Sequence, residues 1–185
     1  MAPSGPLWVQ QFPTSSSVDD LAEPFRSNVR GFLAALNDSG ATVRIADTLR
    51  PPPRVYLMYW SFAISNEKQN PAKVPLMDGV DIQWLHIDSD GNPDPTPSVL
   101  AAAKMVAGYG IVFKPALTSR HTQGLAIDMA ITCQGNLAIR NAVDDLVVIT
   151  SSPRNGSNSD LWSAAVTYGV IKLATDPPHW SSEGH

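Results

Sequence analysis

Two short segments, far apart along the chain, most constrain how this sequence can fold. Residues 119–128 read Ser-Arg-His-Thr-Gln-Gly-Leu-Ala-Ile-Asp, and residues 176–180 read Asp-Pro-Pro-His-Trp. Together they offer the imidazoles of His121 and His179 and the carboxylate of Asp128. Zinc binds these groups readily, and a catalytic zinc site uses three protein ligands and keeps a fourth position for water. The pattern therefore predicts a fold that makes these two segments neighbours.

The residues around the three candidate ligands indicate their local structure. Residues 177–178 are consecutive prolines, which favour an extended backbone and exclude a helix, so His179 is predicted on or beside a strand. Residues 125–131 are apolar and β-compatible, as expected for a buried strand. Gly124 can adopt a positive φ in a turn just before that strand. The first histidine would then come from a loop and the aspartate from the strand.

The same segments offer a general base for a zinc-bound water. The ion lowers the pKa of its water from about 15.7 to about 7, so the water is deprotonated near neutral pH. Asp176 lies three residues before His179 and is not needed as a ligand. Its carboxylate could take the proton from the water and pass it to a leaving amine. The combination predicts a hydrolase that uses Zn²⁺.

These residues also carry a resemblance to a known family. The pattern S-x-H-x-x-G-x-A-x-D followed by D-x-P-H-W resembles the D-Ala-D-Ala metallopeptidase family. That family includes cell-wall carboxypeptidases, vancomycin-resistance dipeptidases and phage L-alanyl-D-glutamate endolysins, and is similar in fold to hedgehog signalling domains. All five fixed positions of the first pattern are present. The resemblance implies that His121, Asp128 and His179 bind Zn²⁺ and that Asp176 is the catalytic base.

The resemblance further implies an arginine at the end of an upstream strand. Residues 43–50 read as a strand that ends at Arg50, whose charge would stabilise the developing oxyanion by roughly 3 kcal/mol. The glutamine that commonly follows this arginine in the family is absent, and residues 51–54 read Pro-Pro-Pro-Arg instead. Ser119 and Arg120 are candidates for substrate binding. A turn-starting serine and a solvated arginine remain the alternatives for these two.

The expected fold class is α+β, with one domain over residues 1–185, a small antiparallel sheet flanked by helices, and the zinc site at the sheet. Ser17 and Ser98 are expected to cap helices. Residues 71–97 contain five prolines and are expected to be mostly loop. The predicted helices cover residues 18–36, 54–64, 99–107 and 160–168, and the predicted strands cover residues 42–46, 125–131 and 170–173.

Composition narrows the partners. The net charge of −4 and the pI near 5.4 argue against nucleic acid, which binds basic faces. No apolar run approaches the roughly 20 residues that cross a bilayer. The N-terminus lacks the basic start and apolar core of a signal peptide. We expect a monomer made in the cytoplasm that reaches the cell wall by another route, such as phage-mediated release.

The leading hypothesis is a zinc peptidase that cuts the stem peptide of peptidoglycan. An L-Ala-D-Glu endopeptidase is placed slightly ahead of a D-Ala-D-Ala carboxypeptidase. The alternative from another class is a zinc-bearing binding module that has lost catalysis, and the presence of Asp176 argues against it. The remaining histidines, His86 and His185, and the single cysteine, Cys133, lack companions at ligand spacing and are expected to be structural.

Overall fold

The computed structural model describes all 185 residues. They form two compact units, each with its own core. Unit 1 comprises residues 1–13 and 51–118, and unit 2 comprises residues 14–50 and 119–185. Most of unit 1 is thus an insertion between the two halves of unit 2. That both units act as one zinc peptidase domain, as the chain length suggests, stays a prediction.

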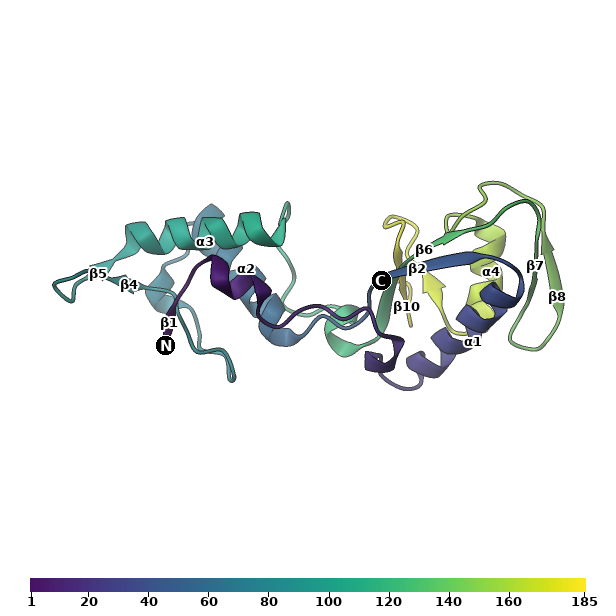
Figure 1. Ribbon diagram of the computed structural model, residues 1–185, viewed down its shortest axis with the longest axis horizontal. Helices are drawn as coiled ribbons and strands as arrows, with labels where there is room; N and C mark the ends of the chain where they lie inside the picture. Colours follow the sequence, from purple (N-terminus) through teal and green to yellow (C-terminus); the bar gives the residue numbers. More distant parts are fainter. The chain divides into compact units, whose positions relative to one another are not determined.

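Unit 2 is built around a four-stranded antiparallel sheet with strand order β2-β6-β10-β9. Helix α1 packs beside β2 and helix α4 beside β9, as Figure 1 shows. The expected α+β class, with a small antiparallel sheet flanked by helices, is therefore confirmed. The strands are β2 (Thr42–Asp47), β6 (Ala126–Thr132), β10 (His179–Ser181) and β9 (Ile171–Lys172).

The first predicted helix is shorter than its apolar pattern suggested. Residues Val18–Asp20 form a 3₁₀ turn, with Ser17 as its cap, and α1 spans only Phe25–Asp38. The prediction of one helix over residues 18–36 was wrong because Pro24 lacks the N–H and the backbone freedom that a helix interior requires. Within α1 the expected spacing holds, and the side chains facing the sheet are buried: Phe25, Val29, Phe32 and Leu36.

The remaining elements of unit 2 follow β6. Strands β7 (Leu137–Arg140) and β8 (Leu146–Ile149) form a hairpin, of which the sequence had indicated only the second strand. Helix α4 (Ser159–Thr167) is capped by Asn158, whose side chain accepts two main-chain N–H groups. This helix lies within one residue of its predicted bounds, because cap and apolar spacing agree.

Unit 1 is organised by two helices, α2 (Pro52–Asn66) and α3 (Pro95–Tyr109), which pack against each other (Figure 1). Its core includes Leu57, Trp84 and Met105. The connection between the helices is mostly loop, as expected. The short elements of this unit are β1 (Ala2–Pro3), η1 (Pro6–Gln10), η3 (Pro71–Lys73), β3 (Ile82–Gln83), β4 (His86–Ile87) and β5 (Pro93–Asp94).

Helix α3 begins four residues before its predicted start at residue 99. Its N-cap is Asp94, whose carboxylate accepts the N–H of Thr96 at 3.1 Å, so the expected cap at Ser98 was wrong. Prolines are tolerated in the first helical turn, where the N–H has no intrahelical partner, and the two prolines here therefore extend the helix. The Ser98 hydroxyl instead donates to the Asp94 carbonyl and accepts the N–H of His86, both at 2.9 Å.

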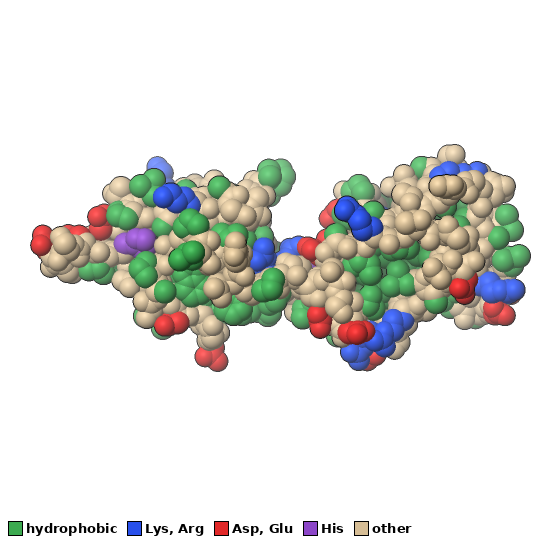
Figure 2. Space-filling view, viewed as in Figure 1, with side chains coloured by type: hydrophobic (Ala, Val, Ile, Leu, Met, Phe, Trp, Pro, Cys, Tyr) green, Lys and Arg blue, Asp and Glu red, His purple; other side chains and the backbone are tan.

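The surface is mixed in charge. On the face seen in Figure 2, basic and acidic side chains are scattered over both units, and neither sign forms a continuous band. None of the helices is long and apolar enough to cross a membrane. His86 belongs to unit 1, where its Nε2 lies 3.0 Å from the hydroxyl of Ser4, so it is held by the local fold.

Candidate metal centre

Unit 2 brings the three predicted ligands together. His121 lies on a 3₁₀ turn, η4 (Arg120–Gln123), which ends at Gly124 in a left-handed conformation with φ of 68°. The chain then enters β6, which carries Asp128, and the paired strand β10 opens with His179 directly opposite Asp128. The turn at Gly124 thus works as expected, and sheet register joins residues that are 51 positions apart. The candidate ligand set is buried at the sheet.

The spacing of the three ligand atoms fits one metal ion. Nε2 of His121 lies 3.2 Å from Oδ1 of Asp128 and 3.2 Å from Nδ1 of His179. Nδ1 of His179 lies 3.1 Å from the same carboxylate oxygen. A tetrahedral zinc ion with ligand distances of about 2.0–2.1 Å separates its ligands by about 3.4 Å. The three atoms therefore outline one face of such a tetrahedron to within a few tenths of an ångström.

A main-chain contact fixes which nitrogen of His121 is free to bind a metal. Nδ1 lies 2.8 Å from the carbonyl oxygen of Thr48. Because a carbonyl only accepts, Nδ1 carries the hydrogen, and the lone pair of the neutral ring is on Nε2. Metal-binding histidines commonly have such an outer partner for the second nitrogen. By contrast, Nε2 of His179 is buried without a hydrogen-bond partner, so pairing of β10 is what orients that ring.

The three side chains also shape each other's ionisation. Burial alone would raise the pKa of Asp128, but hydrogen bonds from His121 and His179 hold it well below its usual value. Burial alone would lower the pKa of His121, but the neighbouring carboxylate outweighs it and raises that pKa above its usual value. Asp128 is therefore ionised at neutral pH, as a metal-binding carboxylate must be.

Asp176, the predicted base, lies in the turn that leads into β10. Its main-chain N–H donates to Leu173 at 3.2 Å, and its carbonyl accepts the N–H of His179 at 3.1 Å. This turn keeps Asp176 next to the last ligand along the backbone. Its side chain is exposed to solvent, and it is not one of the three groups that converge.

A residue that the sequence analysis missed holds this turn in place. Lys172 on β9 is buried, and its ammonium donates to the carbonyls of His179 at 3.0 Å and Leu173 at 2.5 Å, and to that of Asp176. The three ammonium protons thus meet three carbonyls. Burial lowers the pKa of Lys172, and the charges of Asp176 and Asp128 partly offset this. A lysine between apolar residues of a short strand gave no signal of this contact.

Arg50 lies beside the site, although not where the sequence placed it. The strand predicted to end at Arg50 stops at Asp47, after a bulge at residues 45–47, and the prediction of its end was wrong. The following residues turn away and pair with Ser15, so Arg50 stands in a loop. Its guanidinium donates to Asp47 at 3.0 Å, and its main-chain N–H donates to the carbonyl of His121 at 3.1 Å. Arg50 is thereby fixed against one ligand's backbone.

Ser119 and Arg120 flank the first ligand. Arg120 is largely buried and forms an ion pair with Glu183 and a hydrogen bond to Gln123. The hydroxyl of Ser119 is buried and has no partner, while its main-chain N–H and carbonyl both bond to the side chain of Thr122. Their expected roles in substrate binding stay predictions.

Comparison with known proteins adds no family. No family model matches this chain, and no curated protein is significantly similar to it. The structure itself supports a buried His-Asp-His group in an α+β fold that can hold a metal ion.

Proposed function

We propose that this protein is a zinc-dependent peptidase that hydrolyses amide bonds in the stem peptide of peptidoglycan. The observation that carries the proposal is the convergence of three ligand atoms, 3.1–3.2 Å apart, from two segments that also match the pattern of the D-Ala-D-Ala metallopeptidases. His121, Asp128 and His179 would hold Zn²⁺. Two imidazoles and one carboxylate are a donor set used by catalytic zinc, with one position left for water.

The roles of the other residues follow from what they can donate or accept. A bound zinc ion would lower the pKa of water to about 7 and polarise the substrate carbonyl. The exposed carboxylate of Asp176 would accept the proton of the attacking water and deliver it to the leaving amine. The guanidinium of Arg50 would stabilise negative charge on the carbonyl oxygen, and its ion pair with Asp47 would keep it in place.

Between the two possible bonds, we favour L-Ala-D-Glu over D-Ala-D-Ala. A carboxypeptidase needs a cation for the terminal carboxylate of its substrate. Arg120, the candidate for that task, is already paired with Glu183. An endopeptidase has no such requirement, and this supports the first choice. The third alternative is a binding module that keeps zinc without turnover.

Digestion of purified peptidoglycan by the zinc-loaded protein tests all three. New termini identified by mass spectrometry separate them, because an endopeptidase exposes N-terminal D-Glu and a carboxypeptidase releases D-Ala. Absence of any product from protein with one zinc per chain would leave the binding module.

The variant Asp176→Ala tests the base. We expect full zinc content and a loss of turnover of at least about 100-fold, because general-base catalysis contributes roughly 10²–10⁴-fold. Asp38→Ala is the matched control, since Asp38 is an exposed aspartate at the end of α1. Unchanged turnover in Asp176→Ala would remove Asp176 from the mechanism.

A further inference from the structure

Strand β6 leaves part of its edge without a partner immediately beyond the metal ligand Asp128. The N–H of Met129 donates to the carbonyl of Pro178 at 2.8 Å, and the carbonyl of Ile131 accepts the N–H of Gly156 at 3.0 Å. Along a strand, the polar groups of alternate residues point to the same edge. The carbonyl of Met129 and the N–H of Ile131 therefore point to this edge too, away from β2.

Neither of these two groups is paired within the protein. Pro178 stands opposite Met129 and, being a proline, has no N–H to donate to the Met129 carbonyl. The carbonyl of Gly156, opposite Ile131, instead accepts the indole N–H of Trp162 at 2.8 Å. A buried strand edge normally has such groups satisfied, so one acceptor and one donor are left for something else.

The two groups lie on the wall of a hollow. A surface hollow of about 380 Å³ is lined by residues 129–132 of β6, by residues 155–157 and by residues 177–178. The side chains of Met129 and Ile131 are turned into the core, and these residues are only 1% and 2% exposed. Their backbones must therefore be what faces the hollow. Since Met129 follows Asp128 and Pro178 precedes His179, the hollow adjoins the metal centre.

We propose that this hollow binds one extended residue of the substrate peptide, which donates its N–H to the Met129 carbonyl and accepts the Ile131 N–H. The spacing is that of parallel strand pairing, in which one residue bridges the carbonyl of residue i−1 and the N–H of residue i+1. Ala130 would be residue i, and its small exposed side chain leaves room above the strand. This subsite rests on the proposed peptidase function and holds the peptide beside the bond that is cut.

The amide of Ile131 provides a direct test. The ¹⁵N-labelled, zinc-loaded Asp176→Ala variant is titrated with a synthetic stem peptide that begins L-Ala-D-Glu. We expect a downfield shift of the Ile131 amide proton on binding. The amide of Ile127, which is already paired with β10, serves as the internal control. Binding without any change at Ile131 would overturn the subsite and leave the peptidase proposal standing.

Backbone methylation of the peptide tests the other hydrogen bond. One N-methyl group is placed at each position in turn, and one position should weaken binding about 10-fold because the Met129 carbonyl loses its donor. Equal affinity at every position contradicts the subsite. Failure of every peptide to bind or be cleaved contradicts the subsite and the peptidase function together.

A steric variant gives a kinetic readout. Ser157 is exposed on the rim of the hollow, and Ser157→Trp should raise KM about 10-fold while zinc content and kcat change little. Ser159→Trp is the matched control, because Ser159 is exposed on α4 but does not line the hollow. Equal KM values for the two variants would count against the proposed subsite.

Discussion

The two units differ in how they treat buried polar groups. In unit 1, polar side chains inside the fold have partners: Ser61 donates to Met58, and Ser98 joins Asp94 to His86. In unit 2, three groups that prefer to accept face one another across about 3 Å at the sheet. A buried cluster of acceptors needs protons or a cation between its members. Unit 1 therefore looks like scaffold, whereas unit 2 is arranged around something that the polypeptide itself does not supply.

The first way to break this comparison is to remove one core leucine from each unit. Leu36 and Leu57 are both fully buried, in units 2 and 1 respectively. Each change to alanine should destabilise its own unit by about 2–5 kcal/mol through loss of contacts and a cavity. Hydrogen exchange followed by mass spectrometry measures this unit by unit. Equal loss of protection in both units after either change would show that they unfold together.

Exchanging one histidine in each unit should separate binding from scaffold. His121→Ala should weaken zinc binding by more than about 100-fold, since loss of an outer partner alone typically costs 10–100-fold. His86→Ala should leave it unchanged, because that ring contacts only Ser4 in unit 1. Zinc content after dialysis against a competing chelator is the measurement. Retention of zinc by His121→Ala would dismiss the ligand assignment.

Lys172→Met tests whether the ammonium positions the turn before the last ligand. The apolar replacement has similar length but leaves three carbonyls without their donor. We expect about 10-fold weaker zinc binding, comparable to the loss of an outer-shell contact. Leu161→Ala, which destabilises the same unit away from the turn, is the control. If both variants bind zinc equally well, Lys172 acts on stability alone.

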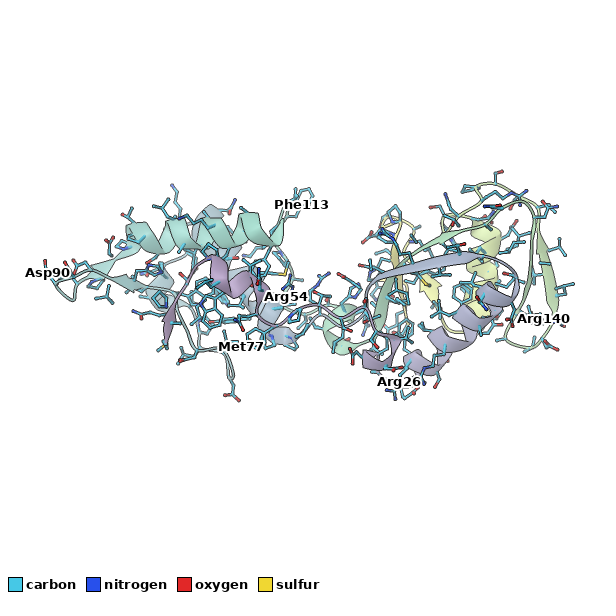
Figure 3. The ribbon with its side chains drawn as sticks, in the orientation of Figure 1. Arg26, Arg54, Met77, Asp90, Phe113 and Arg140 are labelled. Carbon is cyan, nitrogen blue, oxygen red and sulfur yellow. The ribbon has the colours of Figure 1, made fainter.

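The smallest effect concerns alkaline pH and unit 1. Burial raises the pKa of Tyr109 to about 12, although the nearby charge of Arg54 opposes this. Arg54 is labelled in Figure 3, and its guanidinium lies 4.9 Å from the ring centroid. In the unfolded chain a tyrosine titrates near pH 10, so the stabilising contribution is complete below about pH 10 and is lost as the pH rises through about 12.

Stability of unit 1 measured by hydrogen exchange across this range checks the sign. Tyr109→Phe is the control, and it should remove the pH dependence while losing the hydrogen bond to the Trp8 carbonyl. Stability that stays level up to pH 12 in the unchanged protein would contradict the expected linkage.

Sequence patterns predicted the site better than its support. The ligands His121, Asp128 and His179 were identified because metal chemistry limits residue types, and two prolines and Gly124 revealed the backbone between them. Nothing local could show that β10 pairs with β6, or that Lys172 reaches back to the following turn, because these contacts depend on the register between strands.

Helix limits were predicted less well, for reasons that lie in the prolines. Pro24 stops a helix that the apolar spacing favoured, whereas Pro95 begins one earlier than expected. A proline interrupts an interior turn but fits a first turn, so its effect depends on a boundary that the pattern alone does not define. The division into two units was likewise missed, since no polar linker marks it.

The hydrogen bond between the N–H of Arg50 and the carbonyl of His121 has a practical consequence for engineering. The polypeptide departs from unit 2 just after Arg50 and re-enters at Ser119, so exit and entry are neighbours in space. A linker of two or three residues could join them and replace the whole excursion of residues 51–118. The same junction would accept a foreign module without stretching the sheet, which makes it a natural grafting point.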